Sequence, residues 1–111
     1  MSYNIYLTPS FKKQAKRLAK KFRSLSIDLE KLSSSLKVEP TQGISLGKNI
    51  YKIRIHVASK GKGKSGGMRV ITYVKIVAKS VFLLAIYDKS ERGNISDAEI
   101  KNSIAETENG K

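Results

Sequence analysis

The sequence predicts an α+β fold in which a helix hairpin packs on an antiparallel sheet, with the element order β-α-α-β-β-β-α and a short C-terminal helix. Two adjacent segments in the first third of the chain carry apolar residues at helical spacing. Three later segments of strand length follow one another without a helix between them, which favours antiparallel pairing. A length of 111 residues suits one domain. We therefore expect a single domain over residues 1–111, with a frayed tail at 106–111.

The first part of the chain predicts one strand and two helices. Residues 3–7 (YNIYL) are aromatic and β-branched, as strands often are. Thr8 and Pro9 then supply an N-cap and a first helical residue. The apolar stripe of the first helix is Phe11, Ala15, Leu18 and Phe22. Residues 24–26 break this pattern and offer caps for a second helix, whose stripe is Leu25, Leu29, Leu32 and Leu36. Residues 39–47 contain proline and glycine and are predicted to be a loop.

Residues 50–57 and 68–76 predict two strands with one apolar and one cationic face. In the first, Lys52, Arg54 and His56 share a side, and in the second Arg69, Tyr73 and Lys75 do. If the strands pair as a hairpin, these cations line one surface. Solubility alone also places cations on a solvated strand face. The connecting residues 60–67 (KGKGKSGG) add lysines beside glycines, which permit close backbone approach to phosphate.

The end of the chain predicts a buried strand and a capped helix. Residues 80–87 (SVFLLAIY) are apolar on both faces, as in a central strand that is covered on each side. Ser96 and Glu99 have the spacing of a capping box and open the C-terminal helix, with Ile95, Ile100 and Ile104 as its apolar contacts.

The charge of the chain points to an acidic partner. The net charge is +13, and residues 1–80 hold 18 Lys or Arg against 3 Asp or Glu, whereas residues 81–111 hold 4 against 6. Such a basic body suits nucleic acid or a ribosome surface, and it suits an acidic protein as well. The predicted RNA-binding residues are the lysines of the first helix, of the 60–67 loop and of the second hairpin strand: Lys12, Lys16, Lys20, Lys60, Lys62, Lys64 and Lys75. For the helix, a merely solvated face is the alternative.

Several kinds of site and location are disfavoured. Without cysteine, the chain has no disulfide and no thiolate metal site, and with one histidine and few carboxylates we expect neither a metal nor a cofactor. The first residues lack the pattern of a signal peptide, and no apolar run approaches the roughly 18 residues of a membrane span. We expect a cytoplasmic protein without membrane contact.

Three motifs in order resemble the RelE/ParE superfamily of bacterial toxins. They are Tyr51-Lys52-Ile53-Arg54, the run SGGMRVITY at 65–73 and the run LAIYDKSE at 84–91. The loop and strand at 60–71 are most similar to the HigB-type branch. The resemblance implies a toxin of a type II toxin-antitoxin system, an endoribonuclease (mRNA interferase) that cuts mRNA on the ribosome without metal and inhibits translation. It also implies a cognate antitoxin, of the helix-turn-helix type.

The resemblance also implies site residues. By position in the motifs, the family's functional cations correspond to Lys52, Arg54, Arg69 and Lys89. The C-terminal tyrosine or histidine of several members has no counterpart within residues 92–104.

Chemistry alone suggests similar roles. Attack of a ribose 2′-OH on its own phosphate needs cations for the charged transition state and groups that move protons. Arg54, Arg69 and Lys89 can bind the phosphate. The candidate proton carriers are Lys52, Tyr87, Tyr73 and His56, and of the two tyrosines Tyr87 is favoured because it shares strand parity with Lys89.

Two other functions stay open at this point. One is a nonenzymatic toxin of the ParE kind, which has the same fold and inhibits DNA gyrase by binding. The other is a basic RNA- or ribosome-binding module without chemistry. The cations at Lys52, Arg54 and Lys89 favour the endonuclease over the gyrase inhibitor.

Overall fold

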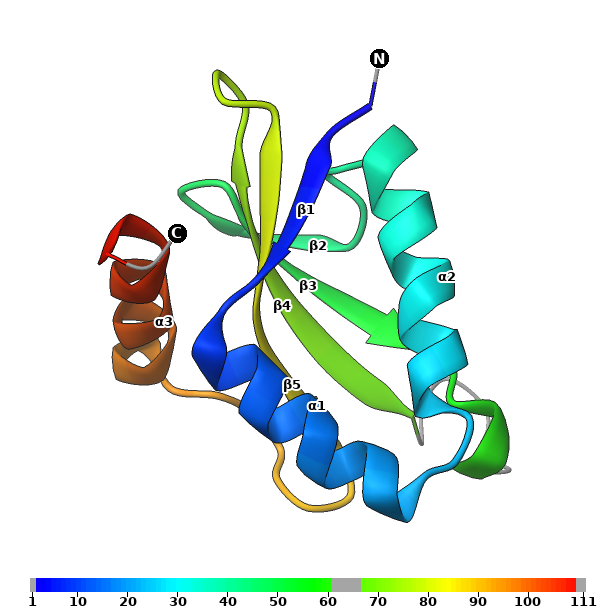
Figure 1. Cartoon of the computed structure of the whole chain (residues 1–111). Coiled ribbons are helices and arrows are strands. Elements are labelled where there is room, and N and C mark those ends of the chain that lie inside the picture. The colour runs from blue at the N-terminus through cyan, green and yellow to red at the C-terminus, as the bar shows by residue number, and fades with distance from the viewer. Residues whose placement is uncertain (1, 61–66, 110–111) are drawn as a thin grey trace.

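The structure is a computed structural model that describes residues 2–60 and 67–109, and it has three helices packed on a five-stranded sheet. The α+β class and the helix pair before the main strands are confirmed. The elements, in order, are β1 (Asn4–Leu7), α1 (Pro9–Lys21), α2 (Leu25–Val38), β2 (Ile44–Gly47), β3 (Ile50–Ile55), the 3₁₀ turn η1 (Ala58–Lys60), β4 (Met68–Lys75), β5 (Ser80–Asp88) and α3 (Asp97–Asn109) (Figure 1).

The sheet is mixed, not purely antiparallel as the sequence predicted. The strand order is β1-β5-β4-β3-β2, and only the β1–β5 pair among the described strands is parallel. The three antiparallel pairs join strands that are neighbours in sequence, which short turns allow. β1 and β5 are separated by most of the chain, so a parallel pairing is open to them.

β2 corrects the prediction of a loop over residues 39–47. All four of its residues are exposed at the sheet edge, and the alternation of Ile44, Ser45 and Leu46 is too short to distinguish a strand from a loop. Gly43 precedes it with a φ of +98°, and a Cβ there would lie 2.6 Å from the Lys52 carbonyl oxygen. Only glycine fits this close approach.

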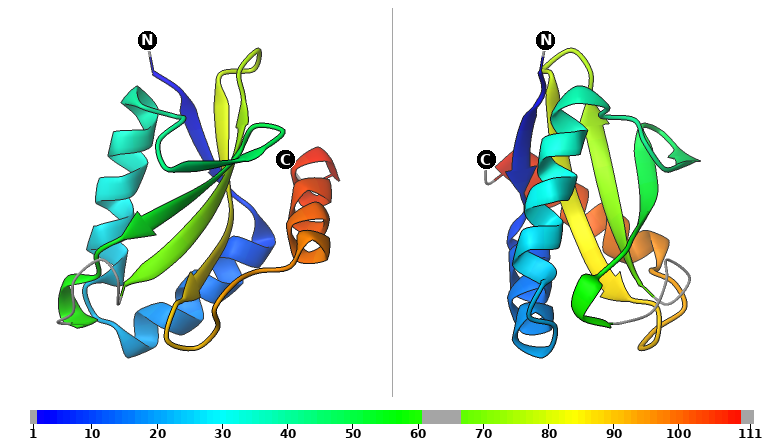
Figure 2. Two further views of the ribbon diagram at one scale, coloured as in Figure 1. Left: turned by 180° about the vertical axis from the view of Figure 1, so that it is seen from behind. Right: turned by 90° about the vertical axis from the view of Figure 1, so that its right-hand side faces the viewer.

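α1 and α2 cover one face of the sheet, and their predicted stripes are the residues that pack there (Figures 1 and 2). The Thr8 hydroxyl accepts a hydrogen bond from the Phe11 N–H at 3.1 Å, and Pro9 occupies the first turn, as predicted. The buried members of the two stripes are Phe11, Leu18, Leu25, Leu32 and Leu36. Figure 1 shows the two helices diverging from their short connection instead of lying closely antiparallel.

α3 packs against the opposite face, where Ile100 meets apolar residues of β4 and β5. The predicted capping box is present. The Ser96 N–H donates to the Glu99 carboxylate at 3.0 Å, and the Glu99 N–H donates to the Ser96 hydroxyl at 3.1 Å. The helix continues to Asn109, so the part of the predicted tail at 106–109 is helical. Glu106 instead accepts hydrogen bonds from the backbone and hydroxyl of Ser10. None of the described helices has the length and apolarity needed to cross a membrane.

Candidate active site

Three predicted site residues lie in one row across the sheet. In the strand register Arg54 of β3 is opposite Arg69 of β4, and Arg69 is opposite Tyr87 of β5. All three alternate with the residues that face α1 and α2, so they lie on the side of the sheet that carries α3. Lys52 lies on this side too, one row further along β3, where it pairs with Ile71. The hairpin prediction of aligned cations is therefore confirmed for Arg54 and Arg69.

A β-bulge places Tyr87 in this row. Ile71 pairs with Ala85 and Thr72 pairs with Leu83, so Leu84 is an extra residue in β5. Before the bulge, Val81 and Leu83 face the helix pair, whereas after it Ile86 does. Tyr87 consequently points to the opposite face. The carbonyl of Leu84 accepts the hydroxyls of Thr8 and Ser103, at 3.3 and 3.2 Å, which anchors the bulge to α1 and α3.

The Tyr87 side chain is buried at 3% exposure, and its hydroxyl has no hydrogen-bond partner among the described residues. Burial raises the pKa of Tyr87, against the lowering effect of the nearby Arg69 and Arg92 charges. The phenol is therefore protonated at neutral pH and suited to donate a proton. A buried hydroxyl without a partner is costly, and a catalytic role is one explanation for such a group.

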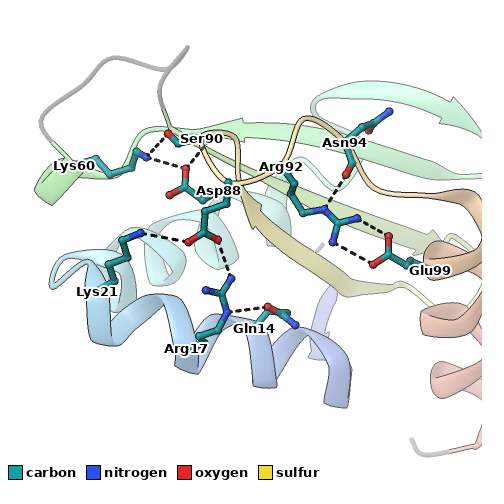
Figure 3. A network of polar contacts seen from close by, with 10 residues as sticks. Gln14, Arg17, Lys21, Lys60, Asp88, Ser90, Arg92, Asn94 and Glu99 are labelled. Atoms are coloured by element: carbon teal, nitrogen blue, oxygen red, sulfur yellow. Dashed lines mark hydrogen bonds and ion pairs between the residues drawn. The ribbon is translucent and has the colours of Figure 1, made fainter.

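Arg92 completes the surroundings of Tyr87 and was not among the residues predicted from the sequence. Its guanidinium carbon lies 5.7 Å from the Tyr87 ring centroid, and the guanidinium donates to both carboxylate oxygens of Glu99, at 3.1 and 2.6 Å (Figure 3). A third bond runs from its Nε to the Asn94 carbonyl at 2.9 Å. The hydrogen bonds from Arg92 lower the pKa of Glu99 to about 2, aided by Ser96. The only sequence signal was an arginine shortly before the capping-box glutamate.

The cations predicted in the first helix and the loop lie elsewhere. Lys12, Lys16 and Lys20 are exposed on α1, which covers the other face of the sheet. Lys16 and Lys20 border an open groove of about 420 Å³ between α1 and α2, with Ala15, Ala19, Leu25, Ser26 and Leu29. Lys62 and Lys64 lie outside the described residues.

Lys60 and Lys75 are engaged in local contacts. The Lys60 ammonium lies 2.8 Å from Asp88 Oδ1, and its side chain is 6% exposed. The Lys75 ammonium lies 5.4 and 5.9 Å from the ring centroids of Phe82 and Tyr73. Lys75 is six residues from Arg69 along β4, which corresponds to roughly 20 Å. Neither lysine joins the row of Arg54, Arg69 and Tyr87.

Three acids lie close to the candidate site, and each is paired with a cation. Glu99 binds Arg92, Asp88 binds Lys60, and Glu91 binds Arg17 and Lys21 of α1 at 3.0 and 3.3 Å. Burial would raise the pKa of Asp88, but hydrogen bonds from Lys60 and Ser90 outweigh it and the pKa is lowered. The pKa of Glu91 is lowered as well, chiefly by its hydrogen bond from Arg17. Among residues 2–60 and 67–109, no three His, Cys, Asp or Glu side chains gather in a way that could hold a metal ion.

Lys89 and His56 lie at the ends of the strands that carry the row. Both are exposed. Lys89 follows β5 directly, and its backbone N–H donates to the Gly67 carbonyl at 3.4 Å. His56 follows β3 and continues the alternation of Lys52 and Arg54. The other candidate proton carrier, Tyr73, is half-buried beside Phe82 at the far end of β4.

Comparisons with known proteins bear on the family and on the fold of the chain. Residues 4–109 match the model of the family described as the RelE toxin of the RelE/RelB toxin-antitoxin system. The structure is similar to that of the E. coli toxin RelE in the free state, in a mutant with two arginines replaced by alanine. The TM-score is 0.63 and the sequence identity 16%, and the match covers 95% of this chain and 97% of that chain. This second likeness shows the shared fold. Because the family match spans nearly all of the sequence, the chain belongs to the RelE toxin family of toxin-antitoxin systems.

Proposed function

We propose that the protein is a ribosome-dependent mRNA endonuclease that inhibits translation, with Arg54, Arg69 and Tyr87 at the centre of its site. The observation that carries the proposal is the pairing of Arg54 directly opposite Arg69. Like charges at opposed positions of a sheet destabilise it. A phosphate is attracted to two such charges together, and arginine suits the two parallel hydrogen bonds that a phosphate accepts.

The reaction that fits these groups is attack of a ribose 2′-oxygen on the adjacent phosphorus. The new bond closes a 2′,3′-cyclic phosphate while the bond from phosphorus to the 5′-oxygen breaks. Arg54 and Arg69 compensate the charge on the non-bridging oxygens. The protonated Tyr87 hydroxyl donates its proton to the leaving 5′-oxygen. The Lys52 side chain, as the neutral amine, is our candidate for accepting the 2′-OH proton. Lys89 is our candidate for a further phosphate contact. These steps use side chains alone, without a metal ion.

The partners in this proposal are a ribosome carrying mRNA and a cognate antitoxin. The antitoxin follows from the family, whose description names a toxin-antitoxin pair. The basic body of the chain supports the ribosome, because 18 cations against 3 acids over residues 1–80 attract RNA through counterion release. Action on ribosomes places the protein in the cytoplasm.

The chemistry of the RNA ends tests the proposal. Programmed ribosomes are incubated with the protein, and the cleaved mRNA is examined at both new ends. The expected products carry a 5′-OH and a 2′,3′-cyclic phosphate. Ends with a 5′-phosphate and a 3′-OH would contradict the mechanism and indicate attack by a metal-activated water. If mRNA stays intact while DNA supercoiling by gyrase is blocked, the protein acts as a ParE-like inhibitor instead. If the protein binds ribosomes tightly but leaves mRNA intact and gyrase active, it is a ribosome-binding module without catalytic activity.

A further inference from the structure

The side chains of Lys60 and Asp88 form an ion pair that is shielded from solvent. Their exposures are 6% and 1%, and Nζ lies 2.8 Å from Oδ1. The ammonium also donates to the Ser90 hydroxyl at 3.2 Å and lies 5.0 Å from the Phe22 ring centroid. Asp88 Oδ1 accepts a second bond from the Ser90 N–H at 2.9 Å. Figure 3 shows the resulting connection between η1 and the end of β5.

The ion pair lies at the turn that carries a predicted site residue on each side. Tyr87 immediately precedes Asp88, and Lys89 follows it. The carbonyl of Asp88 accepts the N–H groups of Glu91 and Arg92, at 2.9 and 3.1 Å, so its backbone as well as its side chain is fixed. The Lys89 N–H donates to Gly67, the described residue before β4. The direction of the chain at residues 87–89 therefore depends on Asp88.

Stability alone explains such a pair poorly. Removing two charges from water costs about as much as their attraction returns, and apolar residues of similar volume often serve a core as well. An apolar pair could fill the space next to Phe22, but it could not make the directional hydrogen bonds to Ser90. The ion pair of Lys60 and Asp88 therefore contributes mainly by orienting the turn after β5.

We propose that Lys60 and Asp88 are positioning residues that fix the turn after β5, so that Tyr87 and Lys89 meet the scissile phosphate in a productive geometry. The inference rests on the proposed endonuclease function. It also gives Lys60 a role other than the direct RNA contact that the sequence suggested. Its ammonium is directed to Asp88, Ser90 and the ring of Phe22.

Single-turnover cleavage of mRNA on programmed ribosomes separates positioning from RNA binding. Lys60→Met and Asp88→Asn should each lower the maximal rate by roughly 10- to 100-fold, since small misplacements cost that much. The half-saturating protein concentration should not change. The double variant should be no slower than the single variants, because each substitution already removes the same ion pair. Lys60→Arg should recover part of the rate. The matched control is Lys31→Met, which removes the same charge from an exposed position on α2.

A direct RNA contact predicts a different pattern. Lys60→Met would then weaken binding and reduce the salt slope by about 1, whereas Asp88→Asn, which removes a negative charge, would not weaken it. That outcome would overturn the positioning role. Parental cleavage by folded Lys60→Met would overturn it too. If Asp88→Asn fails to fold, Lys60→Met and Lys60→Arg still decide the question.

Hydrogen exchange gives a readout that is independent of cleavage. In Lys60→Met the Lys89 amide should exchange at least about tenfold faster, beyond any change at the amides of β4 and β5, because local opening is separable from global unfolding. A uniform increase over β4, β5 and Lys89 would mean that the ion pair only stabilises the fold. If the parental protein does not cleave mRNA, the proposed function fails, while this measurement still reports whether the pair orders the turn.

Discussion

The guanidinium of Arg92 lies over the ring of Tyr87 and is held there by Glu99. The distance from the guanidinium carbon to the ring centroid is 5.7 Å, and the two hydrogen bonds to Glu99 are 3.1 and 2.6 Å long. Glu99 is also the capping-box partner of Ser96 at the start of α3. One carboxylate thus fixes both the start of α3 and the cation beside the buried phenol.

Glu99→Gln should reduce stability by about 1 kcal/mol or less at neutral pH. The side chains of Arg92 and Glu99 are both nearly half exposed, so the expected loss of stability is that of a surface ion pair, not of a buried one. The pKa of Glu99 is lowered from 4.5 to about 2 in the folded protein. Its contribution is therefore present above pH 4.5 and is lost as the pH falls toward about 2. Urea unfolding of both proteins between pH 7 and 2 should show the stability difference shrinking on acidification. A constant difference would mean that the charge of Glu99 contributes nothing.

Tyr87→Phe should separate the chemistry of Tyr87 from its packing. The hydroxyl has no hydrogen-bond partner among the described residues, so its loss should leave stability unchanged or raise it by about 1 kcal/mol. The cleavage rate should fall by roughly 100-fold or more, as expected when a general acid is removed. Urea unfolding and single-turnover cleavage measure the two effects. A Phe variant that cleaves at the parental rate would make Tyr87 a core residue only.

The hydrophobic pattern predicted most of the helices and strands, because their buried faces consist of apolar residues at regular spacing. The stripes of α1 and α2, the two-sided burial of β5 and the capping box of α3 were all predicted and are present. β2 was not, because a short and wholly exposed edge strand has no buried face to mark it. The parallel β1–β5 pair could not be predicted either, since no local signal sets the partner of an isolated N-terminal strand.

The candidate site depends on features that a strand pattern does not encode. Strict alternation from Val81 would turn Tyr87 toward α1 and α2, and only the bulge at Leu84 turns it to the side of Arg69. The position of Lys60 was equally hidden, because its partner Asp88 is 28 residues away in the sequence. The sequence predicted that Arg54 and Arg69 share a cationic face. That they are directly opposite each other follows from the strand register, which only the structure shows.

Arg69→Ala should abolish toxicity while the protein stays folded. In the strand register Arg69 lies between Arg54 and Tyr87, and in the proposed mechanism it contacts the scissile phosphate. By analogy with the loss of one oxyanion donor, the maximal cleavage rate should fall by roughly 10²- to 10³-fold. Arg69→Lys should recover little, because an ammonium cannot make the two parallel hydrogen bonds.

The measurements for Arg69 are growth after induction, single-turnover cleavage and circular dichroism. Circular dichroism is needed because Arg69 is only 6% exposed, so truncation can also disturb packing. A folded Ala variant with the parental cleavage rate would remove Arg69 from the site and weaken the case for the opposed arginines.

The lysines of α1 test whether the cationic helix binds RNA. The triple variant Lys12→Gln, Lys16→Gln and Lys20→Gln should lower ribosome affinity and reduce the slope of log affinity against log salt by about 2 to 3, since each phosphate contact contributes roughly 0.7 to 0.9. These residues lie on the face opposite Arg69, so the cleavage rate at saturating protein should change little.

A second triple variant distinguishes local contacts from net charge. Lys31→Gln, Lys37→Gln and Lys48→Gln lowers the charge by the same amount at exposed positions of α2 and the β2–β3 turn. If both variants lose equal affinity and equal salt slope, long-range attraction by the basic body accounts for binding. If neither loses affinity, the cationic face of α1 is solvated in the ribosome complex. A loss confined to the α1 variant would place ribosomal phosphates against α1, on the side of the sheet away from Tyr87, so that the protein is held by one face and cleaves mRNA with the other.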